Sequence, residues 1–385
     1  MERSQAHIEK VVALKPIPNA DRIEVAQILG WECVVVKGDL QVGDYCVYIE
    51  IDSLVPPTPE FEFLQKYKYR VRTIKLRGQL SQGLALPITD SMRKKIGSLE
   101  EGKDVAKALG ITKHDPQAAA ELKALARKKR GRFMRFLMSF AIFRKIWFWL
   151  HPYANSAFPS WIPKSDETRV QACPERFLNP SGEDRYYISE KLDGQSVTIY
   201  YKYSEKKKKR FGVCSRNISL DPEASGNWQN VARKYDLKNK LQDDYIKSIY
   251  KDGIAIQGEI LAPGVQGNPY RVTEPVLYVF NVFDIDGRYY VPLGELVDVC
   301  QHLGLNTVPI LDEDFDLSKY TLESILKFAE GFSVLEGRED VNREGIVIRA
   351  HKQKPSFKAI SNLYLLKFAK DDEPEEDSTE PPKAE

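Results

Sequence analysis

Short runs of alternating apolar and polar residues fill the first hundred or so positions of the chain. The segments "AHIEKVVALK", "RIEVAQIL", "WECVVVKG" and "DYCVYIEI" each show the period of two that is typical of a half-buried strand. The turn-forming segments "PNAD" and "GDLQVGD" separate these runs. Five or so short strands in such a length indicate a sandwich or an OB-type barrel, so we predict a small β domain over residues 1–110.

A linker is predicted over residues 111–163, with a helical pattern in residues 115–150 and an extended, proline-containing segment from residue 151. The segment "DPQAAAELKALARKKRGR" opens with an N-cap aspartate and a proline at the first helical position. Residues 133–150 are nearly long enough to span a membrane, but Arg135, Arg144 and Lys145 interrupt them. Each basic residue at the centre of a spanning helix costs about 2.5–3.5 kcal/mol. We therefore predict a basic amphipathic linker without stable membrane insertion, and peripheral membrane contact is the alternative.

Strand-like runs return over residues 164–370, together with a few helical stretches such as "GELVDVCQHLG". With the first domain they indicate an α+β protein in which packed antiparallel sheets are flanked by helices. The lysine run at 206–210 lies between two strand-like segments. We expect it at a solvated hairpin tip, and a phosphate contact is the alternative.

The net charge of +2 conceals an uneven distribution of charge along the chain. Residues 371–385 carry eight acidic residues and one lysine, a charge of −7, which leaves +9 on the preceding residues. Such an acidic, proline-containing tail is predicted to be disordered. The basic body suits a polyanionic partner, although a solvated surface with a solubilising tail explains the same composition equally well.

The five cysteines are scattered, odd in number and without C-x-x-C spacing. This pattern predicts reduced thiols and argues against a disulfide framework or a zinc site. The N-terminal segment "MERSQAHIEK" lacks the apolar stretch of a secretory signal. We therefore expect a soluble intracellular protein, in the cytoplasm or the nucleus, that acts as a monomer.

One strand-like stretch, residues 186–203, is interrupted by the tetrapeptide Lys-Leu-Asp-Gly. Alone, the tetrapeptide fits a hairpin turn in which Asp-Gly supplies the left-handed conformations. An ordered series of further polar and aromatic segments follows it. The series comprises Arg216 and Asn217 in "VCSRNISL", Glu259 in "IQGEILAPG", Phe280, Phe283 and Asp284 in "LYVFNVFDIDG", Glu344 in "REGIVIRA", and Lys358 and Lys367 in "PSFKAISNLYLLKF".

The order of these segments resembles that of the covalent nucleotidyltransferases, which comprise polynucleotide ligases and mRNA capping enzymes. "KLDG" is similar to their motif I, "GE" to motif III, "VFD" to motif IIIa, "EGIVIR" to motif IV and "SFK…LLK" to motif V. The segments "FPSWIPKSDETRVQ" and "SFKAISNLYLLK" are similar to the fifth RNA ligase family, the template-dependent type. That resemblance implies an OB nucleic-acid-binding domain (1–110), a basic helical linker (111–163), an adenylyltransferase domain (164–370) and an acidic tail (371–385).

The resemblance implies that Lys191 attacks the α-phosphorus of ATP and forms a lysyl-AMP phosphoramidate. An amine attacks only when it is unprotonated, and a free lysine titrates near pH 10.4. A divalent cation, Lys358 or Lys367 is therefore expected to lower the pKa of Lys191. Asp193 would handle metal, water or the leaving group, and Gly194 would let the backbone turn beside the nucleotide.

The same resemblance implies that ATP binds together with Mg²⁺ or Mn²⁺. Phe283 would stack on adenine, an interaction of about 1–3 kcal/mol, whereas Phe280 is expected in the core. Glu344 and Asp193 would hold the metal through oxygen, and Glu259 would either hold the metal or accept a ribose hydroxyl.

Two motif V lysines, Lys358 and Lys367, would meet the α-phosphate and its developing charge. Many relatives place two lysines one residue apart, but Ile360 occupies that second position here, which leaves the role of Lys367 open. The remaining residues expected to contact the nucleotide or the RNA end are Glu190, Arg216, Asn217, Arg169 and Gln171.

The first domain carries a second resemblance, since "PNADRIEV" and "LRGQLSQGLALP" are similar to OB-type tRNA-binding modules. Asn19 and Asp21 would shape a turn, while Arg77, Ser81 and Gln82 would face the nucleic acid. Affinity for nucleic acid should then fall steeply with salt.

Together these features predict an ATP-dependent RNA ligase that seals 3′-OH and 5′-phosphate ends. The resemblance suggests nicks in duplexes with an RNA 3′-OH strand, RNA or RNA–DNA duplex ends as partners, and a role in RNA repair. One alternative is a GTP-dependent capping enzyme, although capping enzymes carry their OB domain after the lysine motif. The other is a non-catalytic OB-containing RNA-binding protein.

Overall fold

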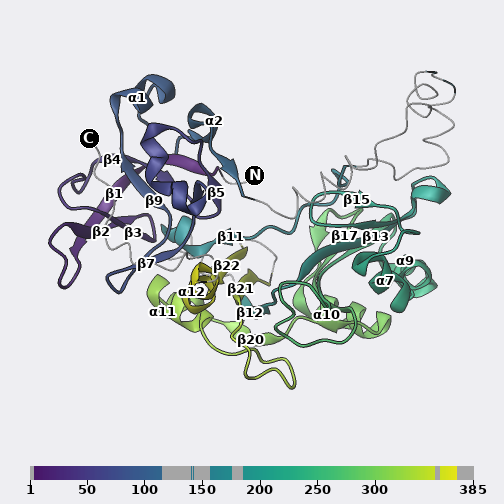
Figure 1. Cartoon of the computed structure of the whole chain (residues 1–385). Helices are drawn as coiled ribbons and strands as arrows, with labels where there is room; N and C mark the ends of the chain where they lie inside the picture. Colours follow the sequence, from purple (N-terminus) through teal and green to yellow (C-terminus); the bar gives the residue numbers. More distant parts are fainter. Residues whose placement is uncertain are drawn as a thin grey trace.

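The computed structural model describes residues 4–114, 140, 142, 157–175, 185–351 and 356–370, without the side chains of Lys208 and of residues 367–370. Most of the predicted linker and the whole acidic tail lie outside the described residues. A small β domain stands beside a larger α+β domain whose two sheets are separate (Figure 1). Among the described residues, no helix is long and apolar enough to cross a membrane.

The small domain is built around a five-stranded antiparallel sheet in the order β3-β2-β1-β4-β9. The 11-residue β1 pairs with β2 on one side and with β4 on the other, and a bulge near Val11 bends it between them. Apolar residues of this sheet, such as Ile8, Trp31 and Val47, are fully buried. The predicted OB-type barrel is confirmed. Its strands are β1 (Ala6–Pro16), β2 (Ile23–Ile28), β3 (Trp31–Val36), β4 (Tyr45–Ile49) and β9 (Leu84–Pro87).

Shorter elements close this barrel. A three-stranded sheet has the order β10-β5-β6, and because β10 pairs with β5, strand pairing of this domain continues to residue 113. A separate hairpin joins β7 and β8. The bounds are β5 (Ser53–Leu54), η1 (Pro59–Tyr67), β6 (Arg70–Val71), β7 (Ile74–Leu76), β8 (Gln79–Ser81), α1 (Asp90–Ile96), α2 (Ala106–Leu109) and β10 (Thr112–Lys113).

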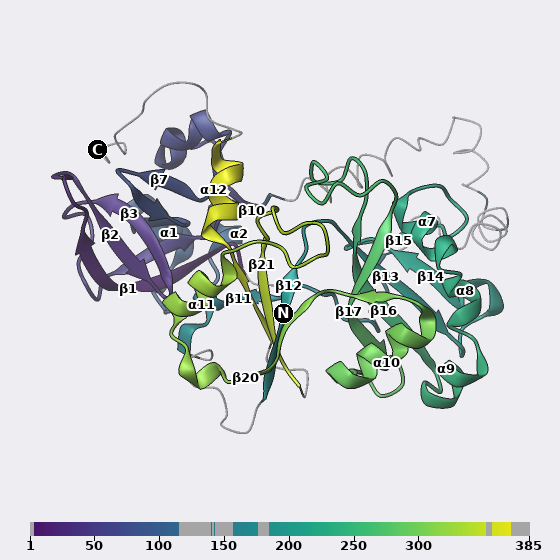
Figure 2. The same cartoon turned by 90° about the horizontal axis from the view of Figure 1, so that it is seen from below.

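The first sheet of the large domain has the order β11-β22-β21-β12-β20 and lies next to the small domain (Figures 1 and 2). Its face is covered by α11, which begins with a capping box of Thr321 and Ser324. Ile188, Ile346 and Ile348 are buried on this side. The elements are β11 (Thr168–Arg169), η2 (Val170–Ala172), β12 (Tyr186–Lys191), β20 (Ile310–Phe315), η4 (Leu317–Lys319), α11 (Leu322–Ala329), β21 (Gly345–Ala350), β22 (Ser356–Ile360) and α12 (Asn362–Lys370).

The second sheet has the order β15-β14-β13-β16-β17-β18, and β19 pairs with β17. Helices pack on it over the largest apolar core among the described residues (Figure 2). The elements are β13 (Gln195–Lys202), η3 (Lys207–Lys209), β14 (Phe211–Cys214), β15 (Ser219–Leu220), α7 (Asn227–Lys234), α8 (Leu237–Lys240), α9 (Asp244–Ile249), β16 (Gly253–Leu261), β17 (Val276–Asp284), β18 (Tyr289–Tyr290), α10 (Leu293–Leu303) and β19 (Asn306–Thr307).

The Lys-Leu-Asp-Gly tetrapeptide connects the two sheets. Strand β12 belongs to the first sheet and β13 to the second, so residues 191–194 carry the chain from one sheet to the other. The tetrapeptide is therefore not a hairpin turn. At Gly194 a β-carbon would lie 2.5 Å from the carbonyl oxygen of Ile260, so no larger residue fits this crossing.

Candidate active site

A cavity of about 550 Å³ opens where the two sheets and the small domain meet. Its walls come from β12, β21 and β22 of the first sheet, from β13, β16 and β17 of the second, and from the small domain. The predicted residues Lys191, Asp193, Glu259, Glu344 and Lys358 all border this cavity. Residues separated by more than 160 positions in the sequence therefore share one site.

The pairing of β12 with β21 brings Lys191 and Glu344 together. Lys191 is opposite Gly345 in the antiparallel register, so Glu344, which immediately precedes β21, lies beside the lysine. The Nζ of Lys191 donates to Oε2 of Glu344 at 2.6 Å. The lysine side chain retains 26% of its exposure, which leaves it accessible from the cavity.

The other two predicted carboxylates have partners at the crossing between the sheets. Glu259 accepts a hydrogen bond from the backbone N–H of Gly194 at 3.1 Å. Asp193 accepts one from the hydroxyl of Tyr364 at 2.6 Å, and its backbone N–H donates to the hydroxyl of Tyr270 at 3.2 Å. These contacts fix the crossing, and neither tyrosine was anticipated from the sequence, although Tyr364 lies inside the motif V segment.

The charges around Lys191 stabilise its protonated form, which cannot act as a nucleophile. Burial alone would lower the pKa of Lys191, but the carboxylates of Glu344, Glu259 and Asp193 outweigh burial and raise that pKa above its usual value. Lys358 therefore does not lower the pKa of Lys191 below its usual value here, whereas the expected effect of a divalent cation stays a prediction. Burial also raises the pKa of Glu259 to about 8, and Glu344 and Asp193 add to this effect.

Lys358 supplies a second amine on the neighbouring strand β22. Burial lowers the pKa of Lys358 to about 8, and the positive charges of Arg169 and Lys191 contribute. Lys358 pairs with Arg169 of β11 in the parallel register, which places two cationic residues at the same wall of the cavity. Lys367 belongs to helix α12 rather than to a strand, and its side chain lies outside the described residues.

The two phenylalanines of β17 lie opposite to the prediction, which placed Phe283 on the adenine and Phe280 in the core. Phe283 is 3% exposed, packs against Tyr290 in an apolar cluster and does not border the cavity. Phe280 lines the cavity instead. The reason is a bulge, because Gln257 pairs with Asn281 and Gly258 with Val279, which leaves Phe280 as the extra residue. The prediction that Phe283 stacks on the base is therefore wrong.

Glu190 borders the cavity, but its carboxylate is turned away from Lys191. Successive strand residues point to opposite faces, and Glu190 shares the face of Ile188, which belongs to the core under α11. The carboxylate accepts a hydrogen bond from the backbone N–H of Val334 at 2.9 Å. Glu190 therefore anchors the loop that leads to Glu344, and its predicted contact with the nucleotide stays a prediction.

The remaining predicted contacts divide into two groups. Arg216 and Arg169 border the cavity, and Arg216 donates to Asp166 at 2.5 Å. Asn217 and Gln171 do not border it. The side-chain oxygen of Asn217 accepts from Lys164 at 3.3 Å, and the carbonyl oxygen of Gln171 accepts from the N–H of Gly30 in the small domain at 2.9 Å.

The small domain supplies part of the cavity wall, which no sequence motif indicated. Asp52, Arg70 and Lys113 border the cavity. Asp52 accepts from Arg70 at 2.7 Å, and its other carboxylate oxygen lies 3.7 Å from Nη2 of Arg169. This aspartate therefore links the two domains at the mouth of the site.

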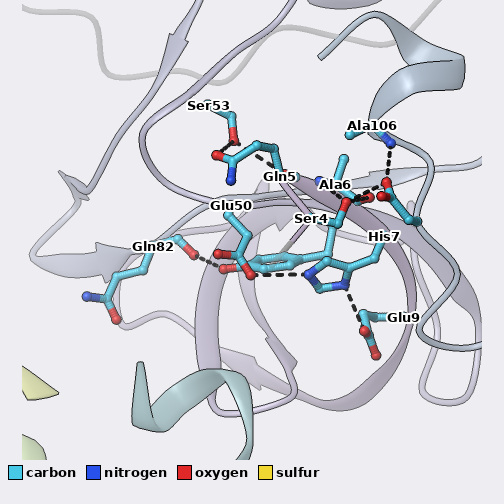
Figure 3. Close-up of polar contacts among 11 residues, drawn as sticks. Ser4, Gln5, Ala6, His7, Glu9, Glu50, Ser53, Gln82 and Ala106 are labelled. Atoms are coloured by element: carbon cyan, nitrogen blue, oxygen red, sulfur yellow. Dashed lines mark hydrogen bonds and ion pairs between the residues drawn. The ribbon is translucent and has the colours of Figure 1, made fainter. Parts of the chain in front are cut away.

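A buried polar cluster supports this wall from inside the barrel. Figure 3 shows His7 between two glutamates, with Nδ1 2.7 Å from Glu9 and Nε2 3.2 Å from Glu50. Glu50 also borders the cavity. The cluster holds the end of β4, from which the chain continues to Asp52.

The residues that resembled a tRNA-binding module have mostly structural roles. Asn19 adopts a positive φ of 60° in a turn, as expected. Ser81 and Gln82 are buried, so the expectation that they face nucleic acid is wrong. Gln82 instead donates to Asn362 of α12 at 3.1 Å. Arg77 is exposed.

Among the residues that the structure describes, no group of three or more His, Cys, Asp or Glu side chains is arranged to hold a metal ion. Glu259, Glu344 and Asp193 nevertheless fit a hard divalent cation chemically, because all three carboxylates border the same cavity and offer oxygen ligands. Mg²⁺ commonly binds one or two carboxylates together with substrate phosphates, so a complete protein cage is not required.

Comparisons with known proteins give consistent results. A family described as an OB-fold domain matches residues 5–88, and a family described as RNA ligase matches residues 184–360. The fold is similar to that of the Naegleria gruberi RNA ligase in three solved forms, each 32% identical to this chain. An apo mutant has a TM-score of 0.77 and covers 96% of this chain and 99% of its own, and the enzyme with pyrophosphate has a TM-score of 0.76 and the same coverage. A mutant with ATP and manganese has a TM-score of 0.76 and covers 94% and 98%. A search of curated proteins found no match.

Proposed function

This chain belongs to the RNA ligase family and is an ATP-dependent RNA ligase, and from that premise we propose that it seals nicks in duplexes through a lysyl-AMP intermediate on Lys191. The observation that carries the proposal is the position of Lys191, whose amine borders a cavity between two sheets and beside Glu344, Glu259 and Lys358. A non-catalytic RNA-binding protein would not need this concentration of reactive groups.

ATP would enter with its base between the sheets and its phosphates toward the small domain. Phe280 of β17 and Val347 of β21 line the cavity from opposite sheets, so they offer an apolar slot for a purine. Lys358 and Arg169 lie where the phosphates would follow. Arg169 has a buried Nη1 without a hydrogen-bond partner among the described residues, which suits a phosphate oxygen.

In the first step the amine of Lys191 would attack the α-phosphorus and expel pyrophosphate. The ammonium of Lys191 must first lose a proton, because an ammonium group has no lone pair for attack, and the carboxylate of Glu344 lies within hydrogen-bond distance to accept that proton. A divalent cation bound at Glu259, Glu344 or Asp193 would neutralise the carboxylates that raise the pKa of Lys191 and polarise the phosphate. Lys358 would stabilise the charge that develops on the α-phosphate.

In the second step the 5′-phosphate of the RNA would attack the lysyl-AMP phosphorus, which gives a 5′–5′ pyrophosphate and frees Lys191. In the third step a 3′-OH would attack the 5′-phosphorus and expel AMP, which forms the phosphodiester. Arg216 borders the same cavity and is placed to meet the incoming 5′-phosphate. All three steps depend on positioning and on neutralising charge, which the cavity supplies.

The first test is mass spectrometry of the protein after incubation with ATP and Mg²⁺ or Mn²⁺. We expect a gain of one AMP on the peptide that contains Lys191 and no gain in Lys191→Ala. A gain from GTP alone would instead identify a capping-type guanylyltransferase. RNA binding without any adenylylation would identify a non-catalytic RNA-binding protein.

The second test is sealing of nicked duplexes whose 3′-OH and 5′-phosphate strands are RNA or DNA in the four combinations. We expect sealing whenever the 3′-OH strand is RNA. Equal sealing of all four duplexes would refute the RNA preference and leave the lysyl-AMP chemistry intact.

A further inference from the structure

Basic residues are concentrated in one segment of the small domain. Between residues 63 and 89 the chain has six basic residues and no acidic one, and all six fall within residues 66–77, which we name the basic arm. Tyr67 and Tyr69 alternate with the basic residues. Cations interleaved with aromatic rings are typical of surfaces that follow a nucleic-acid strand. The basic residues are Lys66, Lys68, Arg70, Arg72, Lys75 and Arg77.

The basic arm extends outward from the active site. Arg70 in β6 borders the cavity. Farther along, β7 contacts helix α12, whose Tyr364 donates a hydrogen bond to Asp193. Figures 1 and 2 show β7 beside α12 from two directions. Arg70 of the arm is therefore in the wall of the cavity, and the β7 part of the arm lies beside α12, which also borders the cavity.

Several charges of the basic arm are not compensated by the protein. Elsewhere in the small domain, Lys10 pairs with Glu101 and Lys15 with Glu32, each at 3.1 Å. In contrast, Lys68, Lys75 and Arg77 are exposed and form no ion pair with any described residue. Uncompensated surface cations hold counterions that a bound polyanion releases, so they favour binding to phosphates.

The tip of the β7–β8 hairpin retains an arginine at an unfavourable backbone position. Arg77 and Gly78 form its two-residue turn, and both have positive φ, 49° and 84°. Such turns favour Asn, Asp or Gly, because other side chains are strained there. Because Arg77 is exposed and its backbone is strained, we infer that its side chain has a function.

We propose that the basic arm is the surface along which the duplex strand entering the active site binds through its phosphates. The inference rests on the proposed function and adds to it the path of the nucleic acid. Arg77 follows Arg70 by seven positions, which corresponds to at most about 25 Å of extended chain and allows contact with several successive phosphates of one strand.

An acidic protein or an anionic membrane would also be attracted to six basic residues. RNA is favoured because Arg70 of the arm lies in the wall of the cavity where the 5′-phosphate would react. A protein or membrane ligand would have no reason to end there.

The test uses the full-length double variant Lys75→Gln/Arg77→Asn. Asparagine suits the positive φ at position 77, so the hairpin should fold at least as well without the arginine. Binding to a nicked RNA duplex is measured by fluorescence anisotropy over a salt series, and adenylylation with ATP is measured separately. We expect about tenfold weaker binding, a slope of log K against log salt that is smaller by about 2, slower sealing and unchanged adenylylation.

The matched control is Lys206→Gln/Lys207→Asn, which removes the same charge from the hairpin tip between β13 and β14. Ser196, near the start of β13, borders the cavity. The hairpin tip follows Lys202 at the other end of β13, which is about 20 Å from Ser196 along the strand. We expect the control to bind and seal like the wild type.

Wild-type binding and salt slope in the arm variant would overturn the proposal, and so would an equal loss in the control, because the effect would then be general electrostatics. Preferential loss of binding to anionic vesicles, with RNA binding intact, would overturn it in favour of a membrane surface. Failure of the proposed function is separate, because it would show as absent adenylylation in the wild type.

Discussion

At the scale of single residues, the site is governed by which charges surround each amine. Lys191 is surrounded by carboxylates that raise its pKa, whereas burial and the neighbouring cations lower the pKa of Lys358 to about 8. Lys191 and Lys358 border the same cavity, but they therefore differ in charge state at mildly alkaline pH. Lys191, the proposed nucleophile, is held as a cation by these carboxylates, and Lys358, which is proposed to face the phosphates, loses its charge first.

The titration of Lys358 predicts how ATP binding depends on pH. A lysine carries its charge below its pKa, so raising the pH through about 8 should remove the cation that faces the phosphates. We expect the affinity for a non-reactive α,β-methylene ATP, at saturating Mg²⁺, to fall between pH 7 and 9.5. Isothermal titration calorimetry would measure this fall.

The comparison variant is Lys358→Arg, because arginine stays protonated throughout this range. Glu259, with a pKa of about 8, gains negative charge over the same range in both proteins, so the difference between them isolates Lys358. Affinity that falls equally in both proteins would show that Lys358 does not control the binding.

At the scale of secondary-structure elements, the bulge in β17 decides which aromatic ring is available to a ligand. A regular strand from Val276 to Asp284 would place Phe280 and Phe283 on opposite faces. The extra residue at Phe280 shifts the alternation, so that Val279 and Val282 both enter the core under the helices. Phe280 is thereby left at the cavity, and Phe283 is buried farther along the strand.

This difference predicts opposite consequences for two alanine variants. Phe280→Ala should raise the KM for ATP roughly 5- to 150-fold, since lost stacking costs about 1–3 kcal/mol, with little change in thermal stability. Phe283→Ala should destabilise the fold by about 3–5 kcal/mol, because it opens a cavity in a packed cluster. Steady-state adenylylation kinetics and thermal denaturation of both variants distinguish the two effects.

Phe280→Tyr serves as the control, because it preserves an aromatic face and should retain a nearly normal KM. If Phe283→Ala instead raised the KM without loss of stability, the assignment of the two rings would be reversed.

At the scale of the whole molecule, the active site exists only while the two domains remain docked. The turn between β2 and β3 inserts against the large domain, where the N–H of Gly30 donates to the carbonyl of Gln171. A β-carbon at Gly30 would lie 2.9 Å from the backbone of Gln171 and 2.5 Å from Leu322. No larger residue fits there unless the domains move apart.

Gly30→Ala should therefore reduce adenylylation without unfolding either domain. A displacement of about 1 Å at a catalytic site can cost about 10²-fold in rate, and the displaced wall contains Asp52 and Arg70. Single-turnover adenylylation would measure the loss, while circular dichroism monitors the fold. Gly294→Ala is the control, since no atom lies within 4 Å of a β-carbon there. An unchanged rate in Gly30→Ala would show that close docking is dispensable.

Much of this arrangement was predictable from the sequence, for identifiable reasons. The alternation of apolar residues predicted the strands, because a strand with one buried face requires that period. The segments around Lys191, Glu259, Glu344 and Lys358 predicted one nucleotide site, and the structure brings those four residues to one cavity. The choice between Phe280 and Phe283 was not predictable, because a bulge leaves no clear signal in a single sequence.

Local residue order was enough to identify the candidate reacting groups and the strands that carry them. What surrounds these groups depends on how distant segments pack together. The small domain completes the cavity with Asp52, Arg70 and Lys113, residues that no motif marks. The charge states of Lys191 and Lys358 follow from burial and from neighbours distant in sequence, since electrostatic interactions depend on separation in space and not on separation along the chain.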